Sequence, residues 1–291
     1  MTIYFGILLA LACAFTTNLA FLYKHRGACA APAVHVRHPL RSARGLFASR
    51  WFTIGMLIAL GAWGAHVGAL ALAPMSVVQA VLAGGVVLLA VMAERLFGFR
   101  IGPRQWLGLG LTALGLMLLG FTLPAIHSAH STFSLPGMIA FEGAFVVVGV
   151  LLIMGKRIGA PDHHHGVMLG AAAGFLFGVS DVSIKAITGL VGSAGLLGAL
   201  LSPWTLVALA ASVAAFYASA KGLQEGEAVP VIALTGVAAN VSGIAGGIVV
   251  FGDPLPGTAL GMALQAVAFL LVIVAAALTP APVRAAAPAG T

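Results

Sequence analysis

The sequence predicts an all-α integral membrane protein, and three observations carry this prediction. Of the 291 residues, 61% are hydrophobic and only 7% are charged, whereas soluble domains average about 25% charged. The apolar residues are concentrated in segments of about 20 residues, the length that crosses a bilayer as a helix. Lys and Arg are almost confined to alternate connections between these segments. We therefore expect a single helical bundle.

Nine segments are apolar and long enough to be expected as transmembrane helices. In chain order they are Thr2–Tyr23, Trp51–Leu72, Pro74–Ala93, Arg104–Leu123, Leu135–Met154, Gly166–Ile187, Pro203–Ala220, Ala228–Val250 and Thr258–Leu278. The first segment has no basic stretch before it and is followed at once by Lys24 and Arg26, so it is interpreted as a span, not as a signal peptide. The bundle is expected over residues 1–279, with approximate halves 1–123 and 135–279, and the Ala/Pro-rich tail 280–291 is predicted to be disordered.

Thirteen of the fourteen Lys and Arg residues fall on one side of this arrangement, and the fourteenth is Lys185 within span six. The positive-inside rule makes the basic side cytoplasmic. The N-terminus is then external and the C-terminus cytoplasmic, in the cytoplasmic membrane of a bacterial cell. This bias accounts for the net charge of +7, so no nucleic-acid partner is needed. The basic loop 24–50 is expected to lie partly on the membrane surface and to contact anionic lipid headgroups.

Span six contains two ionisable residues one helical turn apart, Asp181 and Lys185. Residues four apart lie on one helix face, and this face continues through Gly170, Gly174 and Gly178. A glycine stripe allows another helix to approach closely, so the face is expected to point into the protein. Ionisable groups inside a membrane usually mark a substrate, ion or proton path. The alternative is a neutralised pair that only fixes helix packing.

Four further polar residues inside the spans are candidates for the same pathway. His66, Gln79 and Glu142 are expected at the depth of Asp181, because each lies roughly five to seven residues from the outer end of its span. Asn240 lies nearer the midplane, on a stripe of small residues. The first two and Asn240 could equally bond only to a neighbouring helix. Glu142 is interpreted either as a proton carrier or as the partner of Lys185 in a salt bridge.

The run Asp162-His163-His164-His165 holds residue types that bind zinc or nickel. Adjacent side chains on a short loop converge poorly on one ion, so these histidines are weak metal candidates and a hydrated loop is expected. The sequence has no P-loop, dinucleotide motif or catalytic motif of a soluble hydrolase. We therefore expect no enzyme, no cofactor and no pump that hydrolyses ATP itself.

Two parts of the chain share a pattern of helix, tight turn, helix, acidic turn and helix. The first runs over residues 69–108, with Glu94-Arg95-Leu96 at the acidic turn, and the second over residues 221–261, with Asp253-Pro254-Leu255 there. The long helix starts outside in the first block and inside in the second. This predicts an inverted repeat, a design common among secondary transporters.

At these residues the chain resembles the drug/metabolite transporter superfamily, the EamA-like proteins. The segment Ala73–Gly120 resembles the closing part of their repeat, where Gly-Glu-Arg-Leu precedes a short loop and a Gly-rich helix, although Ala93 stands in place of the glycine. The segment Val250–Val272 resembles the second copy. Most members have ten helices. A count of nine, Lys24 after span one and the lysine in FGVSDVSIKAITG are similar to the NIPA-type magnesium transporters of that superfamily.

The expected function is secondary transport of a small solute across the membrane by alternating access, through a site lined by Asp181, Lys185 and Glu142. The first alternative is a NIPA-like route for magnesium or another divalent cation, which Lys185 disfavours because an ammonium one turn from Asp181 weakens a dication site. A lysine better suits an anionic or zwitterionic solute. A lipid-carrier flippase and a structural subunit are further alternatives. A homodimer is one option for the oligomeric state.

Overall fold

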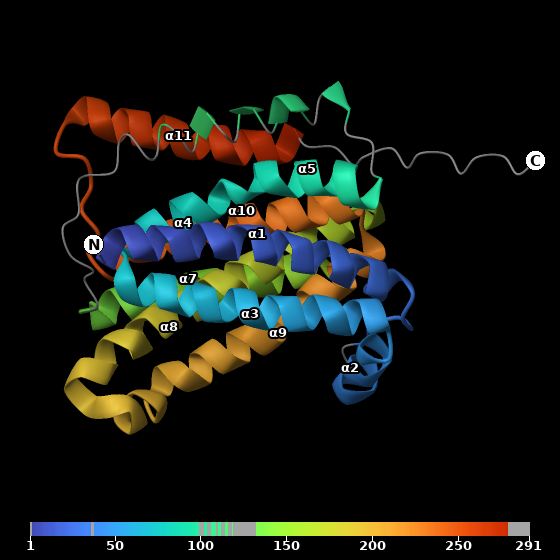
Figure 1. Ribbon diagram of the computed structural model, residues 1–291, viewed down its shortest axis with the longest axis horizontal. Helices are drawn as coiled ribbons and strands as arrows, with labels where there is room; N and C mark the ends of the chain where they lie inside the picture. Colours follow the sequence, from blue (N-terminus) through green and yellow to red (C-terminus); the bar gives the residue numbers. More distant parts are fainter. Residues whose placement is uncertain are drawn as a thin grey trace, which may run out of the picture.

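The computed structural model describes residues 2–35, 38–98 and 132–278, together with 102–103, 106–108, 110–111, 114–115 and 118. Within these residues the regular elements are all helical and no strand occurs, which confirms the all-α prediction. The long helices lie side by side along the long axis of the molecule, as Figure 1 shows.

Six of the described helices are long and apolar enough to cross a membrane. They are α1 (Thr2–Cys29), α3 (Arg50–Leu72), α7 (Leu135–Ile153), α8 (His165–Leu200), α9 (Pro203–Glu225) and α10 (Ala228–Val249). Large apolar side chains such as Leu57, Ile139 and Leu206 lie more than half exposed on the outer surface of the bundle. In water such a surface would be unfavourable, and in a bilayer it faces lipid. The chain is thus a multi-pass membrane protein.

Of the other three expected spans, one is divided into two helices, one forms a single helix and one lies largely outside the described residues. Pro74–Ala93 forms two shorter helices, α4 (Met75–Ala83) and α5 (Gly85–Phe97), and Thr258–Leu278 forms α11 (Ala259–Leu278). Arg104–Leu123 and the tail 280–291 lie largely or wholly outside the described residues. The count of nine spans and the sides on which the termini lie therefore stay predictions.

The expected third span is interrupted at Gly84, where the chain carries two glycines in succession. Two successive glycines weaken a helix because the glycine backbone loses much conformational entropy when it becomes helical and because glycine has no side chain to pack. Asn18 of α1 occupies the space above Gly85 and donates its amide N–H to the Gly85 carbonyl at 3.0 Å. A β-carbon at Gly85 would lie 2.7 Å from that amide nitrogen. The break therefore lets α1 bond directly to the backbone of α5.

Helix α8 is longer than the expected sixth span, continuing past Ile187 to Leu200 with a non-helical glycine, Gly195, near its end. It packs against α7, α9 and α10. The glycine stripe faces α10, since a β-carbon at Gly174 would lie 2.6 Å from the β-carbon of Ala238. Thr235 of α10 also donates its hydroxyl to the Gly170 carbonyl at 3.0 Å. The predicted close approach of a second helix is confirmed.

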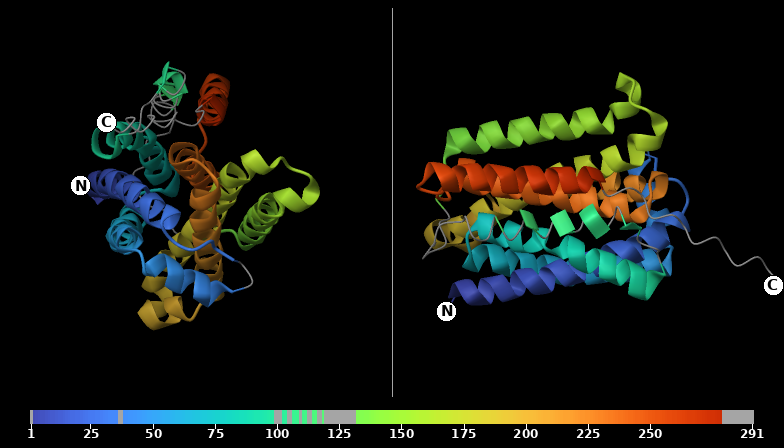
Figure 2. Two further views of the ribbon diagram at one scale, coloured as in Figure 1. Left: turned by 90° about the vertical axis from the view of Figure 1, so that its right-hand side faces the viewer. Right: turned by 90° about the horizontal axis from the view of Figure 1, so that it is seen from above.

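One end of the bundle carries the short elements and most described basic residues, and we call it the basic end. It holds α2 (Pro39–Phe47) and the two 3-10 turns η1 (Gly155–Ile158) and η2 (Asp162–His164). Helix α2 lies across the ends of the long helices, as Figures 1 and 2 show. The chain before it is tied to α9, where Gln224 donates to the carbonyls of Ala28 and Pro32.

Candidate functional site

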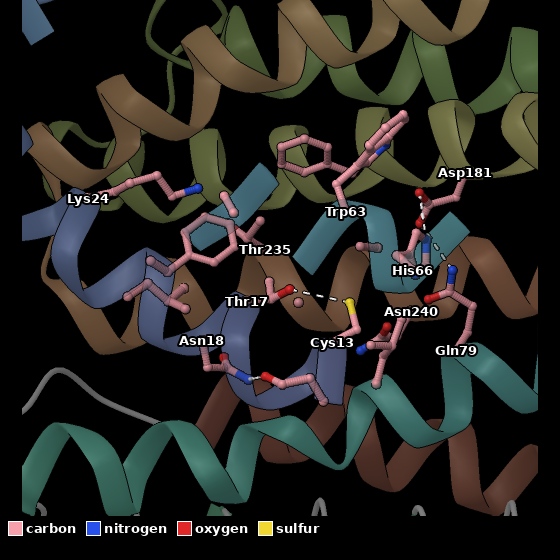
Figure 3. Close-up of a pocket in the computed structure, with 18 residues that line it drawn as sticks. Cys13, Thr17, Asn18, Lys24, Trp63, His66, Gln79, Asp181, Thr235 and Asn240 are labelled. Carbon is pink, nitrogen blue, oxygen red and sulfur yellow. Dashed lines mark hydrogen bonds and ion pairs between the residues drawn. The ribbon is translucent and has the colours of Figure 1, made fainter. Parts of the chain in front are cut away.

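A cavity of about 210 Å³ lies inside the bundle. Its walls come from α1, α3, α4, α8 and α10, so residues far apart in the sequence meet there (Figure 3). Most of the wall is apolar, with aromatic side chains from Phe21, Trp63 and Phe177. Pockets that bind small molecules have this character, with a few polar groups that orient the ligand.

Asp181 of α8 forms the centre of a polar cluster at one end of the cavity. Its Oδ1 lies 3.0 Å from Nε2 of His66 of α3, and its Oδ2 accepts a hydrogen bond of 3.1 Å from the Gln79 amide of α4. Both carboxylate oxygens are therefore engaged by neighbouring helices. Three of the residues expected at one membrane depth are thus in contact, and all three line the cavity.

The polar cluster also carries an atom that has no protein partner. Among the described residues, Oε1 of Gln79 is buried without a hydrogen-bond partner, whereas His66 interacts with both Asp181 and Cys13. The Gln79 side chain packs closely on Gly243 of α10, since a β-carbon on Gly243 would lie 2.5 Å from Cδ of Gln79. This packing restricts the Gln79 side chain to its position beside Asp181. Asn240 lines the cavity nearby (Figure 3). Unpaired buried polar atoms are costly, and a solute or water in the cavity satisfies them.

Helix α1 contributes polar groups that the sequence analysis did not select. Cys13, Thr17, Asn18 and Lys24 all line the cavity. Their spacing of about four and seven residues puts Cys13, Thr17 and Lys24 on one helix face. A search for polar residues at helical spacing inside the first span would have identified them. The apolar character of that span and the position of Lys24 at its predicted end concealed the pattern.

Lys185 lies away from the cavity and does not pair with Asp181. Its side chain is fully buried, and its ammonium donates to the carbonyls of Leu70 and Ala73 at the end of α3. The buried Asp253 also acts electrostatically on it. A cation at a helix C-terminus satisfies carbonyls that have no partner within the helix. Lys185 was expected to line the site with Asp181, and it lies outside the cavity lining because its long side chain reaches the end of α3. The alternative of a neutralised pair is not seen in the described contacts either.

Glu142 of α7 also lies outside the cavity lining. Its Oε1 accepts a hydrogen bond of 2.7 Å from the hydroxyl of Ser183, which is fully buried. Ser183 stands two residues from Asp181, so the two acids contact different sides of α8. The alternative salt bridge from Glu142 to Lys185 is absent from the described contacts, where Lys185 bonds only to carbonyls.

The histidine run lies at the basic end, far along α8 from the cavity. His165 is buried with Nε2 3.7 Å from Glu225, and His164 is exposed, whereas the side chain of His163 lies outside the described set. Within the described residues no three His, Cys, Asp or Glu side chains gather as a metal site. Glu225 instead accepts a hydrogen bond from Lys156 at 3.2 Å, which raises the pKa of Lys156. These contacts join η1, α8 and α9.

Comparison with known proteins gives one informative similarity. The chain is 24% identical over 279 residues to the Arabidopsis thaliana protein named Probable magnesium transporter NIPA9, a match that covers 92% of this chain and 79% of that protein. No protein-family model matches the chain, and no solved structure matches it. The chain is therefore similar, over most of its length, to a protein whose name describes a transporter.

Proposed function

We propose that the protein transports a small organic solute across the membrane by alternating access, with the solute bound in the cavity between α1, α3, α4, α8 and α10. One observation carries this proposal: the bundle forms a cavity whose wall includes the side chains of Lys24, His66 and Asp181, each of which can carry a charge. Such groups are costly inside a membrane and are tolerated where they face a pathway. The similarity to a named transporter supports the same conclusion.

The polar cluster supplies a way to change the shape of this pathway. Asp181 links α8 to α3 through His66 and to α4 through Gln79. A solute that bonds to the unpartnered Oε1 of Gln79 acts on the same side chain that holds Asp181, so its binding is coupled to how α4 and α8 are held. Alternating access requires a coupling of this kind between ligand binding and helix packing.

Cys13 offers a test that does not require the substrate to be known. It lines the cavity, and Cys29→Ser leaves it as the sole cysteine in a chain of two. We expect membrane-impermeant methanethiosulfonate reagents to label Cys13 from at least one side of a vesicle, with Cys13→Ala as the control. A Cys13 that reacts from neither side would contradict a cavity that opens to either side of the membrane, and the transport proposal would fail.

The substrate test uses thermal unfolding of the purified protein with divalent cations, amino acids, sugars and organic acids. A ligand of the folded state raises its stability by mass action. We expect a solute that stabilises the natural protein to lose this effect in Asp181→Asn, and to be taken up by proteoliposomes that contain the natural protein only. Uptake that is unchanged by Asp181→Asn would remove the cavity from the pathway.

Transport of magnesium is the second candidate function, favoured by the name of the Arabidopsis protein. The geometry favours it less. Magnesium needs several oxygen ligands and keeps part of its water shell, whereas both oxygens of Asp181 already accept contacts from His66 and Gln79. Stabilisation by Mg²⁺ that is lost in Asp181→Asn and retained in Lys24→Gln would favour this candidate.

The orientation belongs to the same proposal: the basic end faces the cytoplasm, and the exposed Arg41 and Arg44 of α2 contact anionic lipid headgroups. Leu40 is 84% exposed and would enter the interfacial layer beside them. In a background of Cys13→Ala and Cys29→Ser, Ser193→Cys should be labelled from outside intact cells and Ala48→Cys should not. Labelling of position 48 from outside would reverse the orientation.

A further inference from the structure

Lys24 lies at the opposite end of the cavity from the polar cluster, as Figure 3 shows. Its ammonium lies 3.7 Å from the centroid of the Phe21 ring. In the part of the chain that the structure describes, no carboxylate forms an ion pair with it, although other described lysines have such partners. Lys24 is therefore a cation that faces a largely apolar space with an aromatic face as its neighbour.

The position of Lys24 is fixed by the packing of α1 on α3. Gly55 of α3 is buried against the lysine stem, and a β-carbon there would lie 2.8 Å from Cγ of Lys24 and 2.8 Å from the Ala20 carbonyl. The helices touch at this point because Gly55 has no side chain. The stem cannot fold back across α3, so the ammonium is directed along the cavity wall.

The two charged ends of the cavity differ in how many polar partners their side chains have. At the far end, the single carboxylate of the lining is engaged on both oxygens by His66 and Gln79. At the end where Lys24 lies, its ammonium can donate hydrogen bonds but has no acidic acceptor among the described residues. Between them the lining is mostly apolar, with Phe21 and Phe177. An inorganic ion would lose its hydration against such walls, whereas an organic ion covers them with its own apolar body.

We propose that this cavity binds a small organic anion, whose carboxylate or phosphate group is held by Lys24 and whose apolar part lies along Phe21 and Phe177. Polar substituents at its other end would meet the unpartnered Oε1 of Gln79. This assignment rests on the proposed transport function and names the substrate class for it. An ammonium binds either anion as a compact charge with several donors.

The test measures thermal unfolding of the full chain in detergent with four matched probes. Two are anions, 3-phenylpropionate and phenyl phosphate; one is the neutral 3-phenylpropanamide; and the last is Mg²⁺. At least one of the two anions should raise the unfolding temperature. The anion that gives the larger shift shows whether the cavity prefers a carboxylate or a phosphate group. The amide, which has the same apolar body, should give a smaller shift. If neither anion shifts unfolding more than the amide, the proposal is wrong.

Three variants connect the shift to Lys24. Lys24→Gln should weaken anion binding by about tenfold or more, since a hydrogen bond to a charged group contributes roughly 1.5–3 kcal/mol. Lys24→Arg should retain most of the affinity. Arg26→Gln is the matched control, because Arg26 is exposed on the same helix, lies over Trp51 and does not line the cavity. Unfolding without ligand shows that each variant is folded.

A cavity-filling variant distinguishes the failure of this assignment from the failure of the transport proposal. A β-carbon at Gly236 meets nothing within 4 Å, and Gly236 lines the cavity, so Gly236→Leu fills space there without a clash at its first carbon. If every ligand that stabilises the natural protein stabilises Gly236→Leu equally, none of them binds in the cavity, and the transport proposal fails together with the anion assignment. If Gly236→Leu abolishes binding of a non-anionic solute that Lys24→Gln still binds, transport through the cavity stands and the anion assignment falls.

Discussion

Asp181 and Lys185 stand one turn apart on α8, yet they have different surroundings. Asp181 faces the cavity, contacts His66 and Gln79, and has a side chain that is 16% exposed. Lys185 is fully buried and donates to two carbonyls at the end of α3. Helical spacing places their α-carbons on one face, but the reach of each side chain decides which neighbour it meets. Charge inside a membrane helix therefore serves two purposes here, with Asp181 in the cavity wall and Lys185 holding two helices together.

The largest expected effect tests the structural side of this comparison. Lys185→Met should destabilise the protein by about 3 kcal/mol or more, because it leaves the buried carbonyls of Leu70 and Ala73 without their charged donor. Thermal unfolding in detergent measures it. The control is Lys221→Met, whose lysine is partly exposed and lies 3.6 Å from Glu225, with an expected cost under about 1 kcal/mol. Equal stability of the two variants would contradict the role assigned to Lys185.

A second prediction compares two glycines, Gly174 of α8, which is packed against α10, and Gly236 of α10, which faces the cavity. Gly174→Ala should destabilise the protein by roughly 1–3 kcal/mol, because the new β-carbon would lie 2.6 Å from that of Ala238. Gly236→Ala on the cavity side should change stability by about 0.5 kcal/mol or less, since its β-carbon meets open space. Unfolding midpoints of both variants measure the difference. Similar values would mean that the α8–α10 packing is looser than described.

A smaller effect is expected at Glu142, the acid on the other side of α8. Glu142→Gln keeps an oxygen that accepts the hydrogen bond from Ser183, so stability should change by about 1 kcal/mol or less. Uptake should stay near that of the natural protein, whereas Asp181→Asn should lose it. The two variants are compared in the same proteoliposome assay. Complete loss of uptake in a folded Glu142→Gln protein would add this acid to the pathway.

The smallest expected quantity is the coupling between Asp181 and Lys185. In a cycle of Asp181→Asn, Lys185→Gln and the double variant, the changes in the free energy of unfolding should add to within about 0.5 kcal/mol, as for sites without shared partners. A mutually neutralising pair would instead show the double variant to be clearly more stable than the sum of the single changes. Such a result would favour the neutralised pair that was the alternative interpretation of the sequence.

Much of the architecture was predictable from the sequence because a bilayer imposes simple rules. Apolar length gave the segments of all six described spans, and the glycine stripe of α8 indicated close packing with another helix. The end of α8 was misplaced, since nothing in the apolar run after Ile187 distinguishes a span from its continuation. The inverted repeat, the nine-span count and the sidedness remain predictions.

The candidate site was only partly predictable. Depth along each span brought His66, Gln79 and Asp181 together correctly, because a rise of about 1.5 Å per residue is fixed by helix geometry. The sequence by itself determined which residues are polar, where along each span they lie and which face of their own helix they occupy. The tertiary structure decided that Lys24 enters the cavity while Lys185 and Glu142 lie outside it. The physical reason is that rotation and contact between helices depend on interactions among all five cavity-forming helices, which no single segment encodes.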